Sequence, residues 1–546
     1  MIELTCDVLV VGGGAAGSRA ALEAKRTGKD LSVLIAVAGK NGLSGSSGLI
    51  ASESLGINAP FNFAGDGDNP DVYFEDMVET GGGLGDPKLF RIIADESRAR
   101  VEDLMSLGLH FDSEGGLPIQ RKLSGCTKAR SLTCGGSTGL RILTVLKQAN
   151  IQAGVQVVED IRLFDLLLDD CGRVCGAVGQ IGQEQAVIHA RAVVLATGGA
   201  GRLFRKNVNP PTLDGDGWAM AYRAGARFVN MEFFQIGPGV VNPHMDFIIH
   251  SHLWRLKPRL TNINGQEFIE RYCPPGISVD DVIDLKAMSY PFSVRTIAKY
   301  LDIAIFKEIM EGRGTPNDGV YFDVTHIGEE ELLERCPITY KTIRKAGSDL
   351  AKASIELGLV VQNFNGGVLI DEKGFTGVDG LFAAGEVTGG VHGSDRPGGN
   401  NLIDTQVFGC RAGRFAAAHA LESAGNALGK SHPSAQIVQN AVLENQAIAM
   451  EAASADLYYR NLTVVRTADG LNEVLNFIQK NKSIACTYSS LNRLLVGQLL
   501  AVAALTRKES RGTHYREDFP ATNPEATGRI VIRQGSDGEP VVTIAG

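Results

Sequence analysis

The sequence has no excess of positive charge and no long hydrophobic run. Its formal net charge is −9 over 546 residues, whereas nucleic-acid binding needs a dense basic surface. The longest apolar helical stretch, residues 494–505, is well short of the roughly 20 residues that span a bilayer. We therefore expect no nucleic-acid partner and no direct membrane insertion.

A secretion signal is also missing at the start of the chain. A signal peptide opens with a basic segment and continues with an apolar one. Residues 1–11 instead carry the acidic Glu3 and lead directly into an expected strand. The sequence therefore predicts a cytoplasmic protein.

The nine cysteines contain no Cys-x-x-Cys pair. Pairs at that spacing are typical of iron–sulfur and zinc sites, so we expect no resident metal. A cytoplasmic chain is also not expected to rely on disulfides. Cys171 and Cys175 form the closest pair, and the turn residues between them favour a hairpin with two incidental thiols.

Glycine, by contrast, is abundant, with 66 of the 546 residues against a usual share of roughly 7 per cent. The glycines gather in short runs at 12–14, 81–83, 198–201 and 398–399, without a regular period. Such runs favour tight turns around a ligand over collagen or a flexible linker.

The first forty residues predict a strand, a glycine turn, a helix and a second strand. Gly12, Gly14 and Gly17 follow the apolar run 6–11 with the spacing Gly-x-Gly-x-x-Gly. These glycines permit a sharp turn and close approach of a pyrophosphate, which the helix N-terminus then binds. A dinucleotide site is therefore expected, although residues 35–38 lack the carboxylate that usually ends the second strand.

Two later strands also run into glycine-rich turns. One covers residues 192–196 and is followed by Thr197 and Gly198; the other lies within 380–386 and ends at Glu386. Three such junctions, far apart in the sequence, imply one nucleotide domain assembled from separated segments. An alanine-rich helix is expected from about Gly409.

Several longer motifs are spread over nearly the whole chain. They are the glycine turn at 12–17, Ala-Thr-Gly-Gly at 196–199, Asp-Gly-Asp-Gly at 214–217 with Ala-Gly-Ala at 224–226, Gly-Glu at 385–386, His-Gly-Ser-Asp-Arg-Pro-Gly-Gly-Asn at 392–400, and Glu-Ser-Arg-Gly at 509–512 with His514. In these motifs the chain resembles the flavoprotein subunits of the succinate dehydrogenase, fumarate reductase and L-aspartate oxidase family.

The resemblance implies an FAD cofactor. The residues expected to bind it are Gly12, Gly14, Ala16, Gly17, Ser44, Gly48, Thr197, Gly198, Asp216, Glu386, Arg396, Asn401 and Leu402. Glu386 would supply the ribose contact that the second strand lacks, or else serve as a charge at a helix N-terminus. Arg396 would stabilise negative charge on the reduced flavin.

Many family members attach the flavin covalently through a histidine in the loop after the second strand. Residues 39–51 contain no histidine, and the first histidine of the chain is His110. We therefore predict non-covalent FAD, with the hydroxyl of Ser44 and the backbone of Gly48 among its donors.

The dicarboxylate motifs of the family are altered in this chain. Residues 235–239 read Gln-Ile-Gly-Pro-Gly where the family has Gln-(Phe/Tyr)-His-Pro-Thr-Gly, and residues 250–259 lack the acidic residue of the next motif. Gln362 stands where the family has a second histidine, and only Arg396 survives clearly. Because an enclosed charged oxygen without partners is costly, we expect neither plain succinate nor plain fumarate to be the substrate.

Other residues could take over the chemistry. A cluster of six basic or titratable side chains favours an anionic substrate, although a solvated basic loop is an alternative; its members are His244, His250, His252, Arg255, Lys257 and Arg259. Metal binding is the weaker alternative, since Asp246 is the only nearby carboxylate. We expect His252, Gln362, Arg396 and Arg295, the leading proton donor, to be catalytic; a surface charge is the alternative for Arg295.

These observations predict an α/β protein with three parts. A Rossmann-like FAD-binding domain is expected at 1–225 and 355–420, an inserted α+β capping domain at 226–354, and a C-terminal helical domain with a terminal hairpin at 421–546. Arg511 and His514 would pack within the last domain.

The expected activity is hydride transfer between FAD and a small anionic substrate. The chain has no cluster motif, so we expect an iron–sulfur subunit to exchange the electrons, with oxygen as an alternative acceptor. A different hypothesis is an electron-transfer flavin subunit without a small-molecule substrate of its own, which the lost substrate histidines favour.

Overall fold

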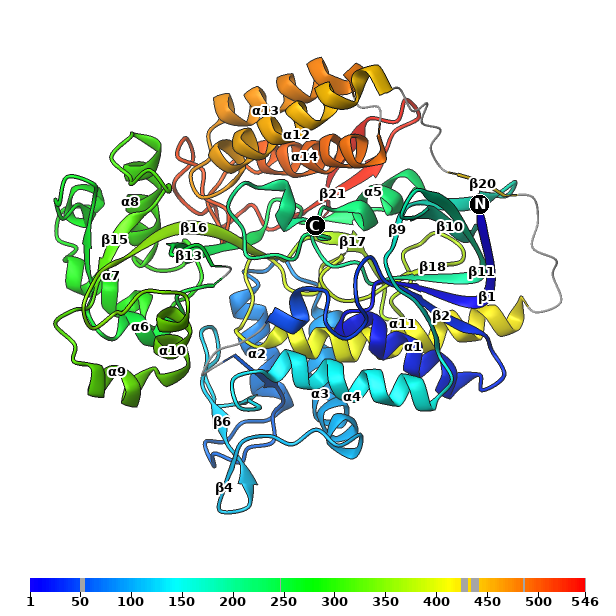
Figure 1. Ribbon diagram of the computed structural model, residues 1–546, viewed down its shortest axis with the longest axis horizontal. Helices are drawn as coiled ribbons and strands as arrows, with labels where there is room; N and C mark the ends of the chain where they lie inside the picture. Colours follow the sequence, from blue (N-terminus) through cyan, green and yellow to red (C-terminus); the bar gives the residue numbers. More distant parts are fainter. Residues whose placement is uncertain (50–54, 246, 424–430, 434–440, 485–486, 546) are drawn as a thin grey trace.

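The computed structural model describes residues 1–49, 55–245, 247–423, 431–433, 441–484 and 487–545 (Figure 1). Asp246 and residues 50 and 51 of the loop after the second strand lie outside these ranges. The largest sheet has eight strands in the order β20-β9-β10-β11-β1-β2-β8, with β18 beside β11.

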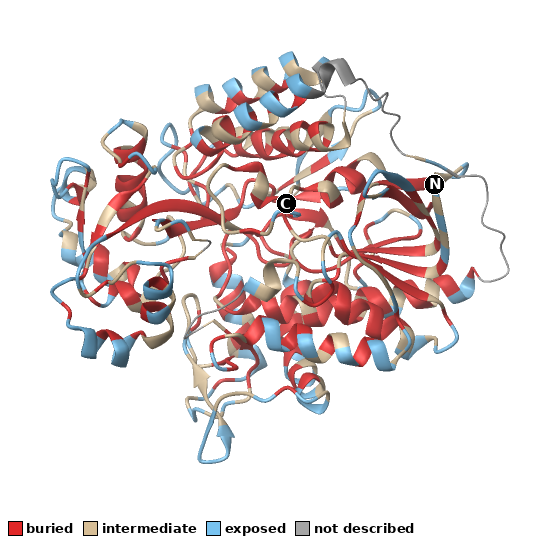
Figure 2. Cartoon of the chain, in the orientation of Figure 1, coloured by how far each residue is buried: buried red, intermediate tan, exposed pale blue. Residues whose placement is uncertain are grey.

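The central strands of this sheet are parallel and apolar. They are β1 (Ile2–Val11), β2 (Val33–Ala36), β8 (Gln156–Val158), β11 (Glu184–Leu195) and β18 (Leu381–Ala383). Strands β2 and β18 and the carboxyl-terminal parts of β1 and β11 are almost continuously buried, because both faces are covered there, whereas the edge strand β8 is half-buried to exposed (Figure 2). Their carboxyl ends meet at one edge of the sheet.

Antiparallel strands extend the sheet on one side. They are β9 (Ile161–Asp169), β10 (Val174–Ile181) and β20 (Ser431–Pro433). The β9–β10 hairpin carries Cys171, which is exposed, and Cys175, which is buried, and neither forms a disulfide. The predicted hairpin is therefore confirmed.

Two long helices cross closely beneath the sheet. Helix α1 (Ala15–Thr27) packs on α11 (Asn400–Glu422). A methyl group on Gly409 would come within 2.7 Å of the Ala16 carbonyl oxygen, and one on Gly413 would overlap Ala20. The predicted helix start near Gly409 is therefore wrong: the helix begins at Asn400, and these glycines allow close helix packing instead of marking its start.

Further helices and short strands lie around this layer. They are β3 (Ile57–Asn58), α2 (Pro70–Thr80), α3 (Pro87–Ser106), β4 (Ser113–Glu114), β5 (Leu117–Pro118), β6 (Gln120–Arg121), β7 (Ser131–Leu132), α4 (Thr138–Gln152), α5 (Asp216–Arg223), β12 (Phe228–Val229), β17 (Gly367–Leu369) and β19 (Thr388–Gly389).

The inserted segment forms a separate lobe, drawn in green in Figure 1. A four-stranded sheet of order β13-β16-β15-β14 packs with five helices. The elements are β13 (Phe234–Asn242), α6 (Ser251–Trp254), β14 (Arg259–Thr261), α7 (Val279–Lys286), α8 (Lys299–Met310), β15 (Val320–Asp323), α9 (Glu329–Arg335), α10 (Pro337–Lys345) and β16 (Ile355–Phe364). Since β16 pairs with both β13 and β15, the boundary expected at 354 falls at the start of a strand of this lobe.

The C-terminal region holds three packed helices and a hairpin. They are α12 (Ala441–Leu462), α13 (Ala468–Asn481), α14 (Tyr488–Thr506), β21 (Arg529–Gln534) and β22 (Pro540–Ala545). Within the described ranges, α14 alone is long and apolar enough to cross a membrane, and 56 % of its apolar window is buried inside the protein.

Arg511 and His514 lie in this region, as expected. Arg511 Nε donates to Glu509 Oε1 at 2.9 Å, and the buried His514 ring contacts the Arg466 guanidinium. Burial, followed by the charges of Arg466 and Arg507, holds the pKa of His514 well below its usual value. Both residues tie the C-terminal segment to the rest of the chain.

An ion pair inside the capping lobe gives a stability prediction. Lys286 Nζ lies 2.6 Å from Asp302 Oδ2, and both side chains are essentially inaccessible to solvent. Replacing Lys286 with Met leaves a buried carboxylate without a partner, so we expect a loss of about 3–5 kcal/mol of stability.

The double variant Lys286→Met, Asp302→Leu removes both charges and should recover most of that loss. Calorimetric unfolding of the two variants and the wild type checks this. A double variant no more stable than the single one would contradict it.

Candidate functional site

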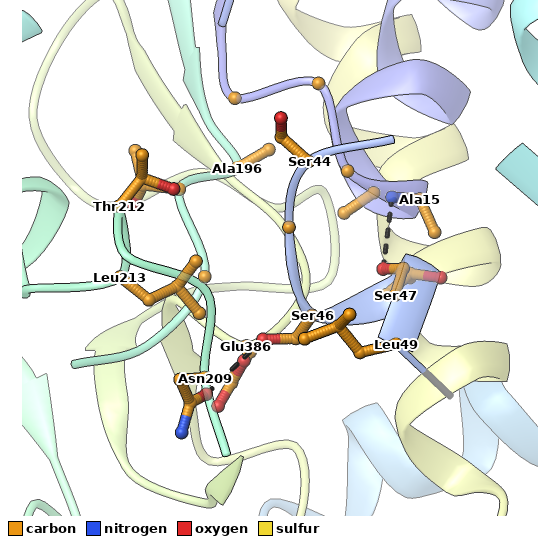
Figure 3. Close-up of a pocket in the computed structure, with 18 of the residues that line it drawn as sticks. Ala15, Ser44, Ser46, Ser47, Leu49, Ala196, Asn209, Thr212, Leu213 and Glu386 are labelled. Carbon is orange, nitrogen blue, oxygen red and sulfur yellow. Dashed lines mark hydrogen bonds between the residues drawn. The ribbon is translucent and has the colours of Figure 1, made fainter. Parts of the chain in front are cut away.

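A cavity of about 280 Å³ opens at the carboxyl edge of the central sheet. All three strand-to-glycine junctions line it, through Gly12–Ala16 after β1, Ala196–Gly198 after β11, and Ala384 and Glu386 after β18. Figure 3 shows several of the lining side chains around this space. Ligands of open parallel sheets bind at this edge.

The first glycine turn leaves no room for side chains. A Cβ atom on Gly12, whose φ is +107°, would overlap the Ala196 carbonyl oxygen, and one on Gly17 would overlap the Gly12 carbonyl oxygen. Gly14 precedes α1, and the Ala15 amide donates to Ser47 Oγ at 3.3 Å (Figure 3). The N-terminus of α1 therefore faces the cavity, where its N–H groups can hold phosphate.

One end of the cavity lies beside the end of β2 and the start of β9. Arg162 lines it and donates through Nε to Asp216 Oδ2 at 2.8 Å, while Asn492 of α14 donates to Asp216 Oδ1 at 2.6 Å. Burial, and then the neighbouring Asp216, raise the pKa of Asp214 to about 7. Asp216 was expected from the sequence; Arg162 and Asn492 were not.

Glu386 lies on the other side of the sheet centre. The Phe364 amide donates to its Oε1 at 3.1 Å, and burial raises the pKa of the carboxyl to about 7. Its strand, β18, is three places from β2 in the sheet, which is about 14 Å at the usual strand spacing. Asn401 and Leu402, at the start of α11, line the same part of the cavity.

The residues of the cavity fit FAD. The glycine turn and helix N-terminus suit a pyrophosphate. Several buried polar atoms of lining residues have no hydrogen-bond partner in the described structure; they are Thr197 Oγ1, His392 Nδ1 and Asp404 Oδ1. An elongated polar ligand would satisfy such atoms. Ser44 and Gly198 also line the cavity, whereas Gly17, Gly48 and Arg396 are not among the described lining residues.

The other end of the cavity reaches the capping lobe. His250 and Gln362 line it together with Phe247 and Ile248. Burial lowers the pKa of His250 to about 3, so its imidazole is neutral at physiological pH. The sequence pointed to Gln362, but it did not separate His250 from the other histidines of its cluster, and it gave no cavity role to His392, although the motif at 392–400 contains it.

Arg396 is buried close to the charges of Glu386 and Asp404, which line the cavity, but it is not itself among the described lining residues. Its Nη2 donates to Gln235 Oε1 at 2.5 Å, and its Nε has no partner in the described structure. Gln235 Nε2 in turn donates to Asp395 Oδ1 at 3.4 Å. Burial lowers the pKa of Arg396 to about 10, so it remains charged at neutral pH and can hold an anion.

Two expected catalytic residues lie farther out. His252 Nε2 is 3.1 Å from Thr339 Oγ1, and Arg295 Nη2 is 3.4 Å from Glu79 Oε1 on a partly exposed surface. Neither is among the described residues that line the cavity. The described ranges also contain no cluster of three potential metal ligands among His, Cys, Asp and Glu, and Asp246 lies outside them.

Known proteins match the chain over almost its whole length. The family model for the FAD binding domain matches residues 7–402, and the model for the fumarate reductase flavoprotein C-terminus matches residues 479–542.

The matching relatives carry related activities. One subunit of the fumarate reductase (CoM/CoB) of Methanothermobacter marburgensis is 35 % identical, covering 97 % of this chain and 97 % of the relative. The L-aspartate oxidase of Streptomyces coelicolor is 32 % identical, covering 98 % and 92 %. Among solved structures, Mycobacterium smegmatis Sdh1 in complex with UQ1 superposes with a TM-score of 0.84 at 28 % identity, covering 100 % and 95 %.

The chain therefore belongs to the FAD-dependent oxidoreductase family of fumarate reductase, succinate dehydrogenase and L-aspartate oxidase flavoproteins.

Proposed function

We propose that this oxidoreductase transfers hydride between non-covalently bound FAD and a small anionic organic substrate other than plain succinate or fumarate. The observation that carries the proposal is the buried Arg396, which stays charged at neutral pH and has an unpartnered Nε. FAD, when bound, supplies the hydride donor or acceptor. The protein's part is to hold the anion and exclude water.

The roles of the other residues follow from their places. Gln235 holds the Arg396 guanidinium in position, and Gln362 offers an amide to the substrate at the capping end. Arg295 is the proposed proton donor and would reach the site through Asp395. Burial raises the pKa of Asp395, and the charge of Arg295 offsets part of that rise. His252 would act only through its neighbour His250.

Fumarate is the second candidate substrate. It is favoured by the Methanothermobacter relative, whose name is that of a fumarate reductase (CoM/CoB), at 35 % identity over nearly the full length. We also propose that an iron–sulfur partner exchanges electrons with the flavin; the name of the Methanothermobacter relative, which is one subunit of a fumarate reductase, supports a multi-subunit assembly. We further propose that the protein is cytoplasmic and depends on that partner for turnover.

The substrate role of Arg396 gives a direct test. In the FAD-loaded protein reduced with dithionite, a panel of enoates and keto acids should reoxidise the flavin. Arg396→Gln should lower kcat/KM for the best substrate roughly a hundredfold, because it removes charge-assisted hydrogen bonds. Stopped-flow absorbance, normalised to bound FAD, measures the rate.

Arg98→Gln, which removes an exposed pair with Glu102, is the matched control and should leave the rate unchanged. If no compound reoxidises the flavin while an iron–sulfur protein does, the electron-transfer hypothesis replaces this one. Equal rates for wild type and Arg396→Gln would remove Arg396 from the substrate site.

The missing histidine predicts how the flavin is held. Because residues 39–51 contain no histidine, acid precipitation of the pure protein should release all the yellow colour into the supernatant. Absorbance of the supernatant and the washed pellet measures the split. Flavin that stays with the pellet would show a covalent bond elsewhere.

Glu386 gives a pH prediction for cofactor binding. Glu386 follows β18, which is three strands away from β2 in the sheet, so we expect it to lie away from the adenosine ribose. We propose that its carboxylate accepts hydrogen bonds from the hydroxyls of the ribityl chain of FAD. In the protein without FAD, the pKa of this carboxyl is about 7. The carboxyl must therefore lose its proton before it can accept these hydrogen bonds. FAD affinity should therefore rise as pH increases, by about tenfold between pH 6 and 8.

Fluorescence titration of the apo-protein at both pH values checks this. Glu386→Gln should bind FAD with the same affinity at pH 6 and pH 8. An equal pH dependence in the variant and the wild type would exclude Glu386 as its source.

A further inference from the structure

Tyr290 lies between two residues that line the capping end of the cavity. Its hydroxyl donates to Gln362 Oε1 at 3.4 Å, and its ring centroid is 5.6 Å from that of His250 in an edge-on arrangement. The segment that carries it is anchored to β13, because the Phe292 amide donates to the Ile236 carbonyl at 2.8 Å. Tyr290 therefore has a fixed place beside the cavity.

The space for the phenol exists only because residue 237 is glycine. A Cβ atom on Gly237 would overlap the Tyr290 hydroxyl and come within 2.8 Å of two ring carbons. Gly237 is also where the related family motif has a histidine. In this chain the Tyr290 side chain occupies the space next to β13 that a side chain at position 237 would otherwise fill.

Gln362 reaches this place through an irregularity in its strand. Gln235 pairs with Asn363, but the next residue, Ile236, pairs with Val361, so Gln362 is an extra residue in β16. Such bulges re-aim a side chain, and they are common next to active sites. With its oxygen engaged by Tyr290, the Gln362 amide has its N–H₂ group left to face the cavity.

The charges differ between the two ends of this part of the cavity. Arg396 is a buried cation close to the lining residues Glu386 and Asp404. Beside Tyr290 the side chains are a phenol, an amide and the neutral His250, and the nearest ions, Lys286 and Asp302, neutralise each other. A second carboxylate placed beside Tyr290 would have no cation to offset its desolvation, whereas an uncharged oxygen would find a donor.

We infer that Tyr290 is a specificity-determining residue that positions the Gln362 amide to donate to an uncharged oxygen at the far end of a monoanionic substrate. The inference rests on the proposed function and narrows its substrate class. The substrate would carry one carboxylate at Arg396 and an ester, ketone or amide oxygen at Gln362. Tyr290 acts through Gln362 and takes no part in the bond changes.

Three probe compounds separate the charges at the far end. They are monomethyl fumarate, fumarate and crotonate, which end in an ester, a carboxylate and a methyl group. Reducing each double bond takes one hydride from the reduced flavin and one proton. The FAD-loaded wild type should favour monomethyl fumarate, both in kcat/KM and in binding to the oxidised protein, which perturbs the flavin absorbance.

In Tyr290→Phe, KM and Kd for monomethyl fumarate should rise about tenfold while the values for crotonate stay unchanged. Gly237→Ala should have the same effect by displacing the phenol. In a Gln362→Met background, Tyr290→Phe should add little, because the two residues act as one unit. Tyr272→Phe, which removes a tyrosine hydroxyl bonded to Glu308 in the same lobe, is the control and should leave the substrate ratio unchanged.

Each result decides a separate point. If fumarate is the best substrate, and the KM and Kd values of Tyr290→Phe equal those of the wild type for all three compounds, the inference is wrong while the proposed hydride transfer stands. Additive effects of Tyr290→Phe and Gln362→Met would also contradict it. If the wild type neither binds nor reduces any panel compound, the proposed function fails, and the inference fails with it.

Discussion

The site depends on how closely the backbone of β1 approaches that of β11 at the carboxyl edge of the sheet. Gly12 touches the Ala196 carbonyl so closely that no side chain fits between them. That contact brings the N-terminus of α1 to the same edge as the turn after β11, and the close packing of α1 on α11 brings Asn401 and Leu402 there as well. The cofactor cavity is therefore built from segments that are far apart in the sequence.

Burial then decides how the ionisable groups around this cavity behave. Burial removes these groups from water and so favours their uncharged forms. It stabilises the protonated carboxyl of Glu386, the neutral imidazole of His250 and, in part, the neutral form of Arg396. Arg396 stays charged, but its partners are few. The charged Arg396 therefore lies close to the cavity near Glu386, whereas the lining groups His250 and Gln362 at the capping lobe are neutral, which limits the charge that a substrate can carry there.

Much of this could be predicted from the sequence because the signals are local. The glycine spacing at 12–17 predicts its own turn, strand and helix, and the longer motifs indicate the family. Contacts between residues that are far apart in the sequence leave no local sequence motif. Arg162 meets Asp216 across two segments, and Tyr290 fills space left by Gly237.

One wrong expectation and one missed feature have physical causes. The alanine-rich helix was expected to begin near Gly409, after a glycine-rich loop, yet Gly409 lies within α11 and lets α1 pack directly against it. Gln362 gave no sign of a bulge, because a bulge depends on the partner strand and not on the residues of its own strand.

The central claim is that three separated strand ends converge on one FAD molecule. Hydrogen–deuterium exchange of the apo-protein, with and without FAD, tests it most directly. Amides in residues 12–17, 196–199 and 384–386 should all become protected together on adding one equivalent of FAD. Protection confined to one of these segments, or no protection at all, would contradict the account.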